Sequence, residues 1–480
     1  MLLTKLIFYY IIRIVIKLYQ NVEKCQFDTT IKSMEVFFVD SLLEKVYSIQ
    51  PQDMADYKKH LMVGGGSPGP CLVKGKGIRV SDINGKEYID CTSQSWALYL
   101  GHGNDEIRDT IYEHMGNTGH IHQGFDTKPR FALAKKLAEL APKNLNRVSF
   151  TVGGGPAIEA AMKIALKNRP GARKFLTLKD AYHGTTLSTA GASWISTKAA
   201  GEFTGYQNFS RCLNDIFTRI PNPYLYRWDM TDNPEDCIDY CLKVARETLI
   251  NGVCGPVAGI IVEPIQASGG QIPLPKRYLQ GLRDLCDEMG CLLIYDEIQT
   301  YCRIGSFFAA NYYDVEPDII CLGKALGAGF PIAAVIIHDR LKGFDINGEE
   351  LHTFANNSVS QIAALKQIDI IERDNLLENT NVVGKHIADR LAEMQKEIPQ
   401  IGDIRQVGLH IGIEMVEDPA TKEPLKKAGE IKSKALENGM ILGTGGFRKN
   451  ILKIKPPLIT TIAEADEICD IFYKTLKEVL

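Results

Sequence analysis

The sequence predicts an α/β fold with a mainly parallel sheet flanked by helices, followed by a smaller α+β domain. Short apolar runs alternate with helical stretches over residues 148–337, and this alternation is typical of βαβ units in a parallel sheet. From residue 341 onward the order changes, because two long helical stretches precede the next strand candidates. This change indicates a second domain.

The elements follow in order from the amino-terminal side. Residues 40–57 have a helical pattern, and the glycine-rich stretch 64–70 is a loop. Residues 73–88 alternate apolar and polar side chains around Asn84-Gly85, a pair typical of tight hairpin turns. The strand candidates of the large domain are residues 147–151, 175–178, 259–262, 292–295 and 332–337.

The later part of the chain supplies the small domain. Its helix candidates cover residues 360–373 and 382–398, and its strand candidates cover residues 410–415 and 451–454. The predicted organisation is an extension (1–33), a segment joining the small domain (34–90), a large cofactor-binding domain (91–340) and the small domain (341–480).

Composition limits the classes of function. The 480 residues are 45% hydrophobic and 24% charged, as in ordinary globular enzymes, and the formal net charge of −3 suggests no nucleic-acid partner. The twelve cysteines contain no CxxC motif, and no histidine lies near Cys237 and Cys241 to complete a metal site. We expect reduced core thiols in a cytoplasmic protein, and no metal.

The first 33 residues differ from the rest. Residues 2–19 are rich in isoleucine, leucine and tyrosine, but Lys5, Arg13 and Lys17 interrupt the apolar run that a membrane helix needs. No small-residue cleavage site follows. A basic amphipathic anchor on a membrane surface is one interpretation. A disordered or non-native extension is the interpretation that we favour.

Asp296 and Lys324 are the most informative pair. An apolar run over residues 292–295 ends in Asp296, and 28 residues later a second apolar run ends in Gly323-Lys324. An enzyme that uses pyridoxal phosphate needs a lysine to hold the aldehyde and an acid to keep the pyridine nitrogen protonated. Taken alone, a lysine after a buried strand is usually a solvated strand end, and an acid in that position is often a helix cap.

Other motifs add candidate binding groups. The run Gly153-Gly154-Gly155 follows a strand and opens a helix, where backbone N–H groups favour a phosphate. Tyr182 and His183 stand where an aromatic ring stacks on a planar cofactor, although a core tyrosine and a loop histidine fit the same pattern.

Glu263 and Thr353 are the last two candidate binding residues. Glu263 follows a buried strand, at the sheet edge where ligands of open α/β folds bind. Thr353 precedes a helix and either binds a phosphate or caps that helix. In this order the motifs resemble the class III (ω-amino acid) aminotransferases, which are pyridoxal phosphate enzymes of fold type I. The resemblance covers residues 50–478 and implies a seven-stranded sheet in the large domain.

The resemblance also implies roles for residues around the cofactor ring. Lys324 would hold the cofactor as a Schiff base and move the proton. Asp296 would pair with the pyridine nitrogen, and Gln299 would reach the phenolic oxygen. Ile298 and Tyr182 would lie on opposite faces of the ring.

Further roles concern the phosphate and the substrate. Gly154 and Gly155 would bind the phosphate, with His183 among the cofactor contacts. Thr353 would reach the phosphate of a neighbouring subunit, which implies a homodimer with its active site at the interface. Glu263 would lie near the substrate as a third catalytic residue.

Departures from the family pattern concern the substrate. Lys453 stands where many members have an arginine that binds a substrate carboxylate, and lysine lacks the planar two-point fork. Trp96 aligns with a pocket tryptophan of the pyruvate-dependent members and with Tyr99 would form an apolar wall; core packing is the alternative. Pro156 stands in the phosphate loop, where a hydroxyl contact is lost.

The predicted activity is transfer of an amino group from a ω- or β-amino acid, or an amine, to a 2-oxo acid in a ping-pong reaction. Pyruvate, glyoxylate and 2-oxoglutarate are the candidate acceptors. A racemase or epimerase of the same family is the alternative within enzymes. A non-catalytic binding protein is a third interpretation, which the presence of Lys324 disfavours.

Overall fold

The computed structural model describes residues 41–62, 69–197, 215–345 and 348–480. The predicted extension over residues 1–33 and most of the 64–70 loop lie outside these ranges. The chain divides into two units, residues 1–69 and 70–480. In the first unit the predicted helix appears as α3 (Ser41–Tyr47) and α4 (Pro51–Tyr57), followed by η2 (Lys58–His60). Pro51 opens α4, because proline fits the first helical position.

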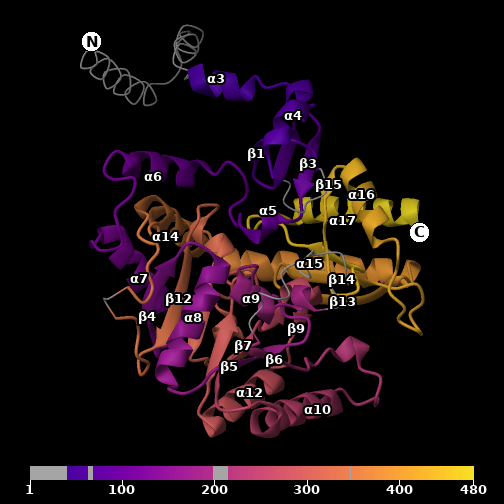
Figure 1. Cartoon of the computed structure of the whole chain (residues 1–480). Coiled ribbons are helices and arrows are strands. Elements are labelled where there is room, and N and C mark those ends of the chain that lie inside the picture. The colour runs from indigo at the N-terminus through magenta and orange to yellow at the C-terminus, as the bar shows by residue number, and fades with distance from the viewer. Residues whose placement is uncertain (1–40, 63–68, 198–214, 346–347) are drawn as a thin grey trace. The chain divides into compact units, whose positions relative to one another are not determined.

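A seven-stranded sheet forms the centre of the second unit (Figure 1). Its strand order is β4 (Leu145–Thr151), β12 (Ala333–His338), β11 (Ile319–Leu322), β10 (Leu292–Asp296), β7 (Val257–Val262), β5 (Lys174–Leu178) and β6 (Phe217–Ile220). The four pairs from β11 to β6 are parallel, whereas β12 runs antiparallel to both of its neighbours. The predicted α/β fold with a mainly parallel sheet is therefore confirmed.

Helices cover both faces of this sheet. Ile260 and Leu293 belong to one apolar cluster, while their chain neighbours Ile261 and Ile294 belong to another. Successive strand residues point to opposite faces, so a strand buried on both sides has a continuous apolar sequence. On one face α8 (Gly154–Asn168) packs against β7, β11 and β12. On the other face α12 (Lys276–Met289) packs against β7 and β10.

The hairpin predicted around Asn84-Gly85 belongs to a second sheet. It has the order β1 (Leu72–Lys76), β2 (Arg79–Asp82), β3 (Glu87–Asp90) and β15 (Met440–Ile441). Gly85 has a φ of +82°, which favours glycine in the turn. Because β3 pairs in parallel with β15, residues near both ends of this unit share one sheet.

The carboxyl-terminal part contains an antiparallel sheet and long helices. The sheet has the order β13 (Ile401–Val407), β14 (His410–Met415), β17 (Ile451–Ile454) and β16 (Gly443–Gly445). The helices are α14 (Ser358–Arg373), α15 (Leu376–Glu397), α16 (Ala428–Glu437) and α17 (Ile462–Val479). β13 was not among the predicted strands, since its residues do not alternate regularly between buried and partly buried positions.

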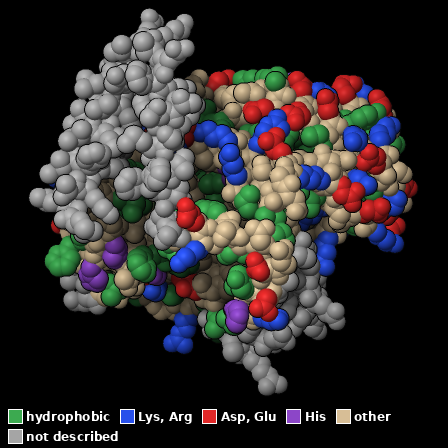
Figure 2. Space-filling view, turned by 90° about the horizontal axis from the view of Figure 1, so that it is seen from above, with side chains coloured by type: hydrophobic (Ala, Val, Ile, Leu, Met, Phe, Trp, Pro, Cys, Tyr) green, Lys and Arg blue, Asp and Glu red, His purple; other side chains and the backbone are tan. Residues whose placement is uncertain are grey.

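Shorter elements and the remaining helices connect these layers. They are α5 (Ser93–Trp96), α6 (Asp105–Met115), α7 (Lys128–Leu140), α9 (Leu187–Ala192), η3 (Trp194–Ser196), η6 (Leu225–Arg227), α10 (Pro234–Glu247), η7 (Thr248–Gly252), β8 (Ile265–Gln266), α11 (Ala267–Gly270), β9 (Ile272–Pro273), α13 (Ala309–Tyr313) and η8 (Lys324–Gly327). Among the described residues, no helix has both the length and the apolar character that crossing a membrane requires. Figure 2 shows acidic and basic side chains interspersed on the face seen from above.

Candidate active site

A cavity of about 240 Å³ lies at the carboxyl edge of the parallel strands. It is lined by Gly154, Gly155, Pro156, Tyr182, His183, Gly184, Thr185, Thr186, Glu263, Asp296, Ile298, Gln299 and Lys324. Nine of these residues carry a role in the prediction from sequence. They come together because β5, β7 and β10 are parallel, so the loops that follow these strands share one edge of the sheet.

Glycines form one wall of the cavity. A Cβ atom on Gly154 would lie 2.8 Å from Cδ1 of Ile298, and one on Gly155 would lie 3.0 Å from Cγ2 of Thr186. Gly184 has a φ of +124°, and a Cβ atom there would lie 2.7 Å from Oγ1 of Thr189. This wall includes the amino-terminal end of α8, where backbone N–H groups and the helix dipole favour an anion.

Asp296 is held at the end of β10. Its Oδ2 lies 2.8 Å from Nδ1 of His183, and its Oδ1 accepts a hydrogen bond of 3.1 Å from the backbone N–H of Ile298. The backbone N–H of His183 in turn donates to Oγ of Ser193 at 2.9 Å. A carboxylate only accepts, so the His183 ring carries its proton on Nδ1. The arrangement keeps a negative charge at the cavity.

Lys324 enters the cavity from an unusual backbone conformation. Its φ is +45°, in the left-handed region that costs free energy for any residue except glycine. Within the described part of the chain, its Nζ forms no hydrogen bond. Burial lowers the pKa of Lys324, while Asp296 and Glu263 act to raise that pKa. A lysine with a lowered pKa has more of the neutral amine that attacks a carbonyl.

Glu263 links the two loops that bound the cavity. Its carboxylate accepts hydrogen bonds from the backbone N–H of Tyr182 at 2.8 Å and of Ala267 at 3.0 Å. Burial raises the pKa of Glu263 to about 7; His183 acts to lower that pKa and Asp296 to raise it. Glu263 therefore both supports the site and titrates near neutral pH.

Trp96 lies under two lysines rather than in an apolar wall. Nζ of Lys453 lies 5.9 Å from the centre of its ring, and Nζ of Lys455 lies 4.5 Å from it. Burial lowers the pKa of Lys453 to about 8. Ser93 to Trp96 all have φ between +45° and +71°, so α5 is a left-handed turn that costs free energy.

Lys455 is a residue that the sequence analysis missed. It is fully buried, and its Nζ donates a hydrogen bond of 3.1 Å to Oε1 of Gln299. The signal was present, because residues two apart in a strand share a face and Lys453 was already a candidate.

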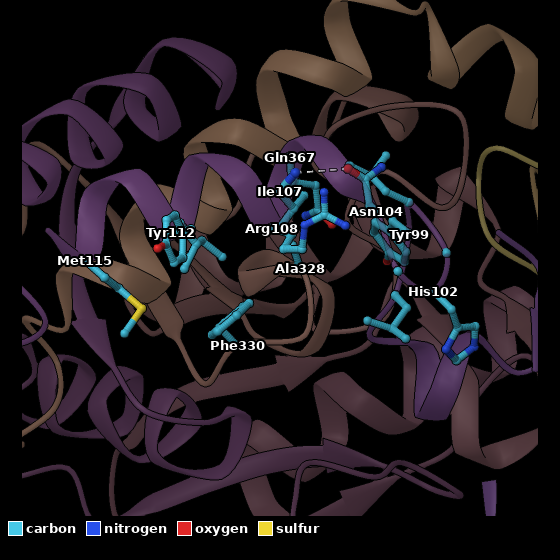
Figure 3. Close-up of a pocket in the computed structure, with 15 residues that line it drawn as sticks. Tyr99, His102, Asn104, Ile107, Arg108, Tyr112, Met115, Ala328, Phe330 and Gln367 are labelled. Carbon is cyan, nitrogen blue, oxygen red and sulfur yellow. Dashed lines mark hydrogen bonds between the residues drawn. The ribbon is translucent and has the colours of Figure 1, made fainter. Parts of the chain in front are cut away.

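Four of the predicted residues do not line the cavity of Lys324: Trp96, Tyr99, Lys453 and Thr353. Tyr99 lines a different pocket, of about 420 Å³, in which Figure 3 shows Tyr112, Met115 and Phe330 on one side and Tyr99 on the other. The guanidinium of Arg303 lies 4.7 Å from the centre of the Tyr99 ring, which keeps this ring in the core. Thr353 is exposed and lines neither pocket. It does not cap α14, because the side chain of Asn357 does so.

The residues of the cavity fit pyridoxal phosphate. The glycine wall suits the phosphate, the Asp296 carboxylate suits a protonated pyridine nitrogen, and the amine of Lys324 suits the aldehyde. Together with the seven-stranded sheet, this cavity defines the class of fold type I pyridoxal phosphate enzymes.

Comparison with known proteins agrees with this class. The family model described as "Aminotransferase class-III" matches residues 64–476, so the chain belongs to the class III aminotransferases and uses pyridoxal phosphate as its cofactor. The expected family, fold type and enzyme class are thereby confirmed.

Relatives and solved structures cover most of the chain. A probable 4-aminobutyrate aminotransferase of Bacillus subtilis is 33% identical over 81% of this chain and 88% of its own length. An alanine/serine racemase of Pyrococcus horikoshii is 31% identical over 85% of both chains. The PMP-bound form of an aminotransferase from Vibrio fluvialis has a TM-score of 0.81 at 25% identity, covering 90% of this chain and 99% of that one.

Proposed function

We propose that this aminotransferase takes the amino group from a ω- or β-amino acid, or from an amine, and passes it to a 2-oxo acid such as pyruvate, glyoxylate or 2-oxoglutarate. The observation that carries the proposal is the Lys324 amine, which shares one cavity with the carboxylates of Asp296 and Glu263. The 4-aminobutyrate named for the Bacillus subtilis relative is a ω-amino acid and supports this donor class.

Different residues would hold the phosphate, the ring and the ring nitrogen of the cofactor. Gly154 and Gly155 would bind the phosphate through the end of α8, and Tyr182 and Ile298 would contact the two faces of the ring. Asp296, oriented by His183, would keep a proton on the pyridine nitrogen through charge pairing. When bound, pyridoxal phosphate supplies an electron sink for the carbon that loses a proton.

Lys324 would be the base and acid of the reaction. Because the pKa of Lys324 is lowered, more of its amine is neutral at a given pH. The neutral amine would accept a proton from the substrate carbon and return it at a different carbon. Glu263 lies near enough to act on the pKa of both Lys324 and Lys453. We assign Glu263 the role of adjusting the pKa of these two lysines, which its negative charge raises.

The substrate end of the site would carry Lys453 and Trp96. Among the described residues, Lys453 forms no ion pair, and its Nζ lies over the Trp96 ring. A substrate carboxylate would meet a single-point cation here instead of the two-point fork of an arginine. This difference favours donors that are held by one oxygen and by contact with the indole ring.

An absorption experiment tests the activity. The purified chain is mixed with pyridoxal phosphate, and spectra are recorded before and after adding single amino donors. We expect a visible band that changes to the pyridoxamine form with ω-amino acids and returns when a 2-oxo acid is added. A band that no amino donor changes would contradict the proposed substrates.

Racemisation is the second candidate, because one relative is named as an alanine/serine racemase. The same cavity and the same lysine serve both reactions, which differ in the carbon that regains the proton. The discriminating measurement is the chirality of alanine or serine after incubation. A change of chirality without any pyridoxamine form would favour the racemase.

We further propose a homodimer. Several large apolar side chains around α6 and the segment before α14 are exposed, and such clusters mark protein contacts in many proteins. They are Tyr112, Met115, Phe125, Phe330, Leu351 and Phe354. Sedimentation of the full chain tests this proposal, and the exchange of Phe354 for aspartate should shift the mass toward one chain.

The cellular location and the domain boundaries also remain proposals. The ten described cysteines are free, which suits a reducing cytoplasm. The pairing of β3 with β15 supports the assignment of the hairpin before residue 90 to the carboxyl-terminal part. The boundaries after residues 33 and 340 rest on the sequence pattern. Limited proteolysis of the full chain would locate the exposed boundaries.

A further inference from the structure

Lys455 is a buried lysine whose side chain forms one hydrogen bond among the described residues. It follows β17, and its Nζ donates to Oε1 of Gln299, which belongs to the turn after β10. The backbone around Lys455 is fixed on both sides. Its N–H donates to the carbonyl of Cys91 at 2.9 Å, and its own carbonyl accepts from Oγ of Ser93 at 2.7 Å. The position of the amine is therefore set by the surrounding structure.

This bond determines which way the Gln299 amide faces. The Lys455 amine donates to the amide oxygen at 3.1 Å, so this oxygen is the atom that faces Lys455. The NH₂ group of Gln299 then lies on the other side of the amide. Within the described part of the chain, this nitrogen donates no hydrogen bond, and Gln299 lines the same cavity as Lys324.

The charges around Lys455 are mainly positive. Lys324, Lys453 and Arg303 lower its pKa, in addition to burial, while Glu263 acts to raise it. Burial lowers the pKa of His410, whose ring nitrogens have no hydrogen-bond partner among the described residues, and Lys455, Arg303 and Lys453 lower it further. A buried amine costs free energy unless a polar group satisfies it. The Gln299 amide and the Trp96 ring are the groups that do so.

We propose that Lys455 is a positioning residue, which turns the Gln299 amide so that its N–H points at the phenolic oxygen of the bound cofactor. This inference rests on the proposed function, in which Gln299 reaches that oxygen. Lys455 itself does not contact the reacting atoms. Its effect passes through the orientation of one amide.

The expected consequence is spectroscopic. An N–H donated to the phenolic oxygen stabilises its negative charge, which is greatest after the bound cofactor has lost its proton. The donor therefore lowers the pH midpoint at which the visible absorption band changes. In Lys455→Met the amide rotates freely and presents its oxygen part of the time. The midpoint should rise by about one pH unit.

A double-mutant cycle separates this route from a direct charge effect. The full chain is loaded with pyridoxal phosphate as wild type, Lys455→Met, Gln299→Leu and the double variant, and each is titrated by absorbance without any amino donor. If Lys455 acts through Gln299, the exchange to methionine has no further effect in the Gln299→Leu background. An equal shift in both backgrounds would overturn the proposal, because the lysine charge alone would then explain it.

Lys453→Met is the matched control. Lys453 is another buried lysine over the Trp96 ring, but it forms no hydrogen bond with Gln299. Its effect on the midpoint should add to that of Gln299→Leu. If Lys455→Met does not fold, Lys455→Gln replaces it, since glutamine is shorter by one bond and does not reach Oε1.

A failure of the proposed function and a failure of the role of Lys455 would give different results. If wild type forms no visible band with pyridoxal phosphate, the cofactor site itself is wrong. If the band forms but the cycle shows no coupling, only the role of Lys455 is wrong.

Discussion

Nδ1 of His183 lies 2.8 Å from Oδ2 of Asp296, and both side chains are buried. The histidine follows β5 and the aspartate ends β10, so two parallel strands supply one hydrogen-bonded pair. The other oxygen of Asp296 is held by the backbone N–H of Ile298. The carboxylate therefore keeps one orientation before any ligand arrives.

Asp296→Asn should lower kcat by roughly 10²–10³-fold, the scale at which one preorganised electrostatic contact contributes. The amide carries no charge, so the pyridine nitrogen of the bound cofactor loses the group that keeps it protonated. Stopped-flow absorbance of the first half-reaction measures the effect.

Asp318→Asn provides the control for this variant. Asp318 is also a buried carboxylate, directly before β11, but it pairs with Arg283 and Arg340 outside the cavity. Its exchange should lower stability and leave the half-reaction rate per folded molecule unchanged. Near-normal rates in Asp296→Asn would contradict the role of Asp296.

Lys324→Ala should lower the turnover rate by about four orders of magnitude or more. The removed amine is both the point at which the cofactor attaches and the base. The chain should still fold, because removing the side chain relieves an unpaired amine in a partly buried place. Circular dichroism and steady-state turnover check the two parts.

Lys453→Ala tests whether the removal of another lysine near the cavity also abolishes turnover. We expect a raised KM for donors that carry a carboxylate, with the visible band of the bound cofactor retained. Substantial turnover in Lys324→Ala would transfer the catalytic assignment to another amine.

Gly184→Ala should weaken cofactor binding and lower stability by roughly 1–3 kcal/mol. The new Cβ would meet Oγ1 of Thr189 at 2.7 Å and Cα of Gly155 at 3.1 Å, in a left-handed backbone. Gly171→Ala is the matched control, because Gly171 has a φ of +87° and nothing within 4 Å of a Cβ. Equal losses of cofactor affinity in both variants would show that backbone strain alone is responsible.

The contribution of Glu297 to the stability of the cofactor-free chain should fall as the pH rises from about 5 to 7.5. Burial raises the pKa of Glu297 to about 7, although hydrogen bonds from Ala309 and Ala310 oppose the rise. Between a pKa of about 4.5 in the unfolded chain and about 7 in the folded chain, the folded state binds the extra proton. This contribution is present in full at low pH and is lost as the pH passes 7.

Glu297→Gln should remove up to about 3 kcal/mol of that pH dependence, measured as the free energy of unfolding in urea at both pH values. The contribution of Glu263, whose pKa is also raised to about 7, remains in the variant. An unchanged pH slope would mean that Glu297 is ionised in the folded chain.

Much of the fold followed from local patterns. The runs ending in Val262 and Tyr295 are apolar on both faces, as expected of a strand that helices cover on two sides. β13 was not predicted, because its side chains do not alternate regularly between buried and partly buried positions. The helix expected over residues 40–57 divides at Pro51, whose ring ends the preceding helical pattern.

The cavity shows where sequence reasoning ends. Glycines, an aspartate and a lysine that each follow a strand must meet at one edge of a parallel sheet, so their proximity could be predicted. Whether Tyr99 faced that cavity could not be predicted, because the choice depended on the packing of Arg303 over its ring.

The sequence by itself determined the family, the cofactor and the order in which the candidate binding residues follow the strands. These properties depend on residues close together in the chain. Only the tertiary structure decided that Lys455 bonds to Gln299, 156 positions away, and that Trp96 lies under two lysines. The physical reason is that such contacts arise when the carboxyl-terminal sheet packs against the turn after β10. That packing optimises burial over the whole core, and no local pattern specifies it.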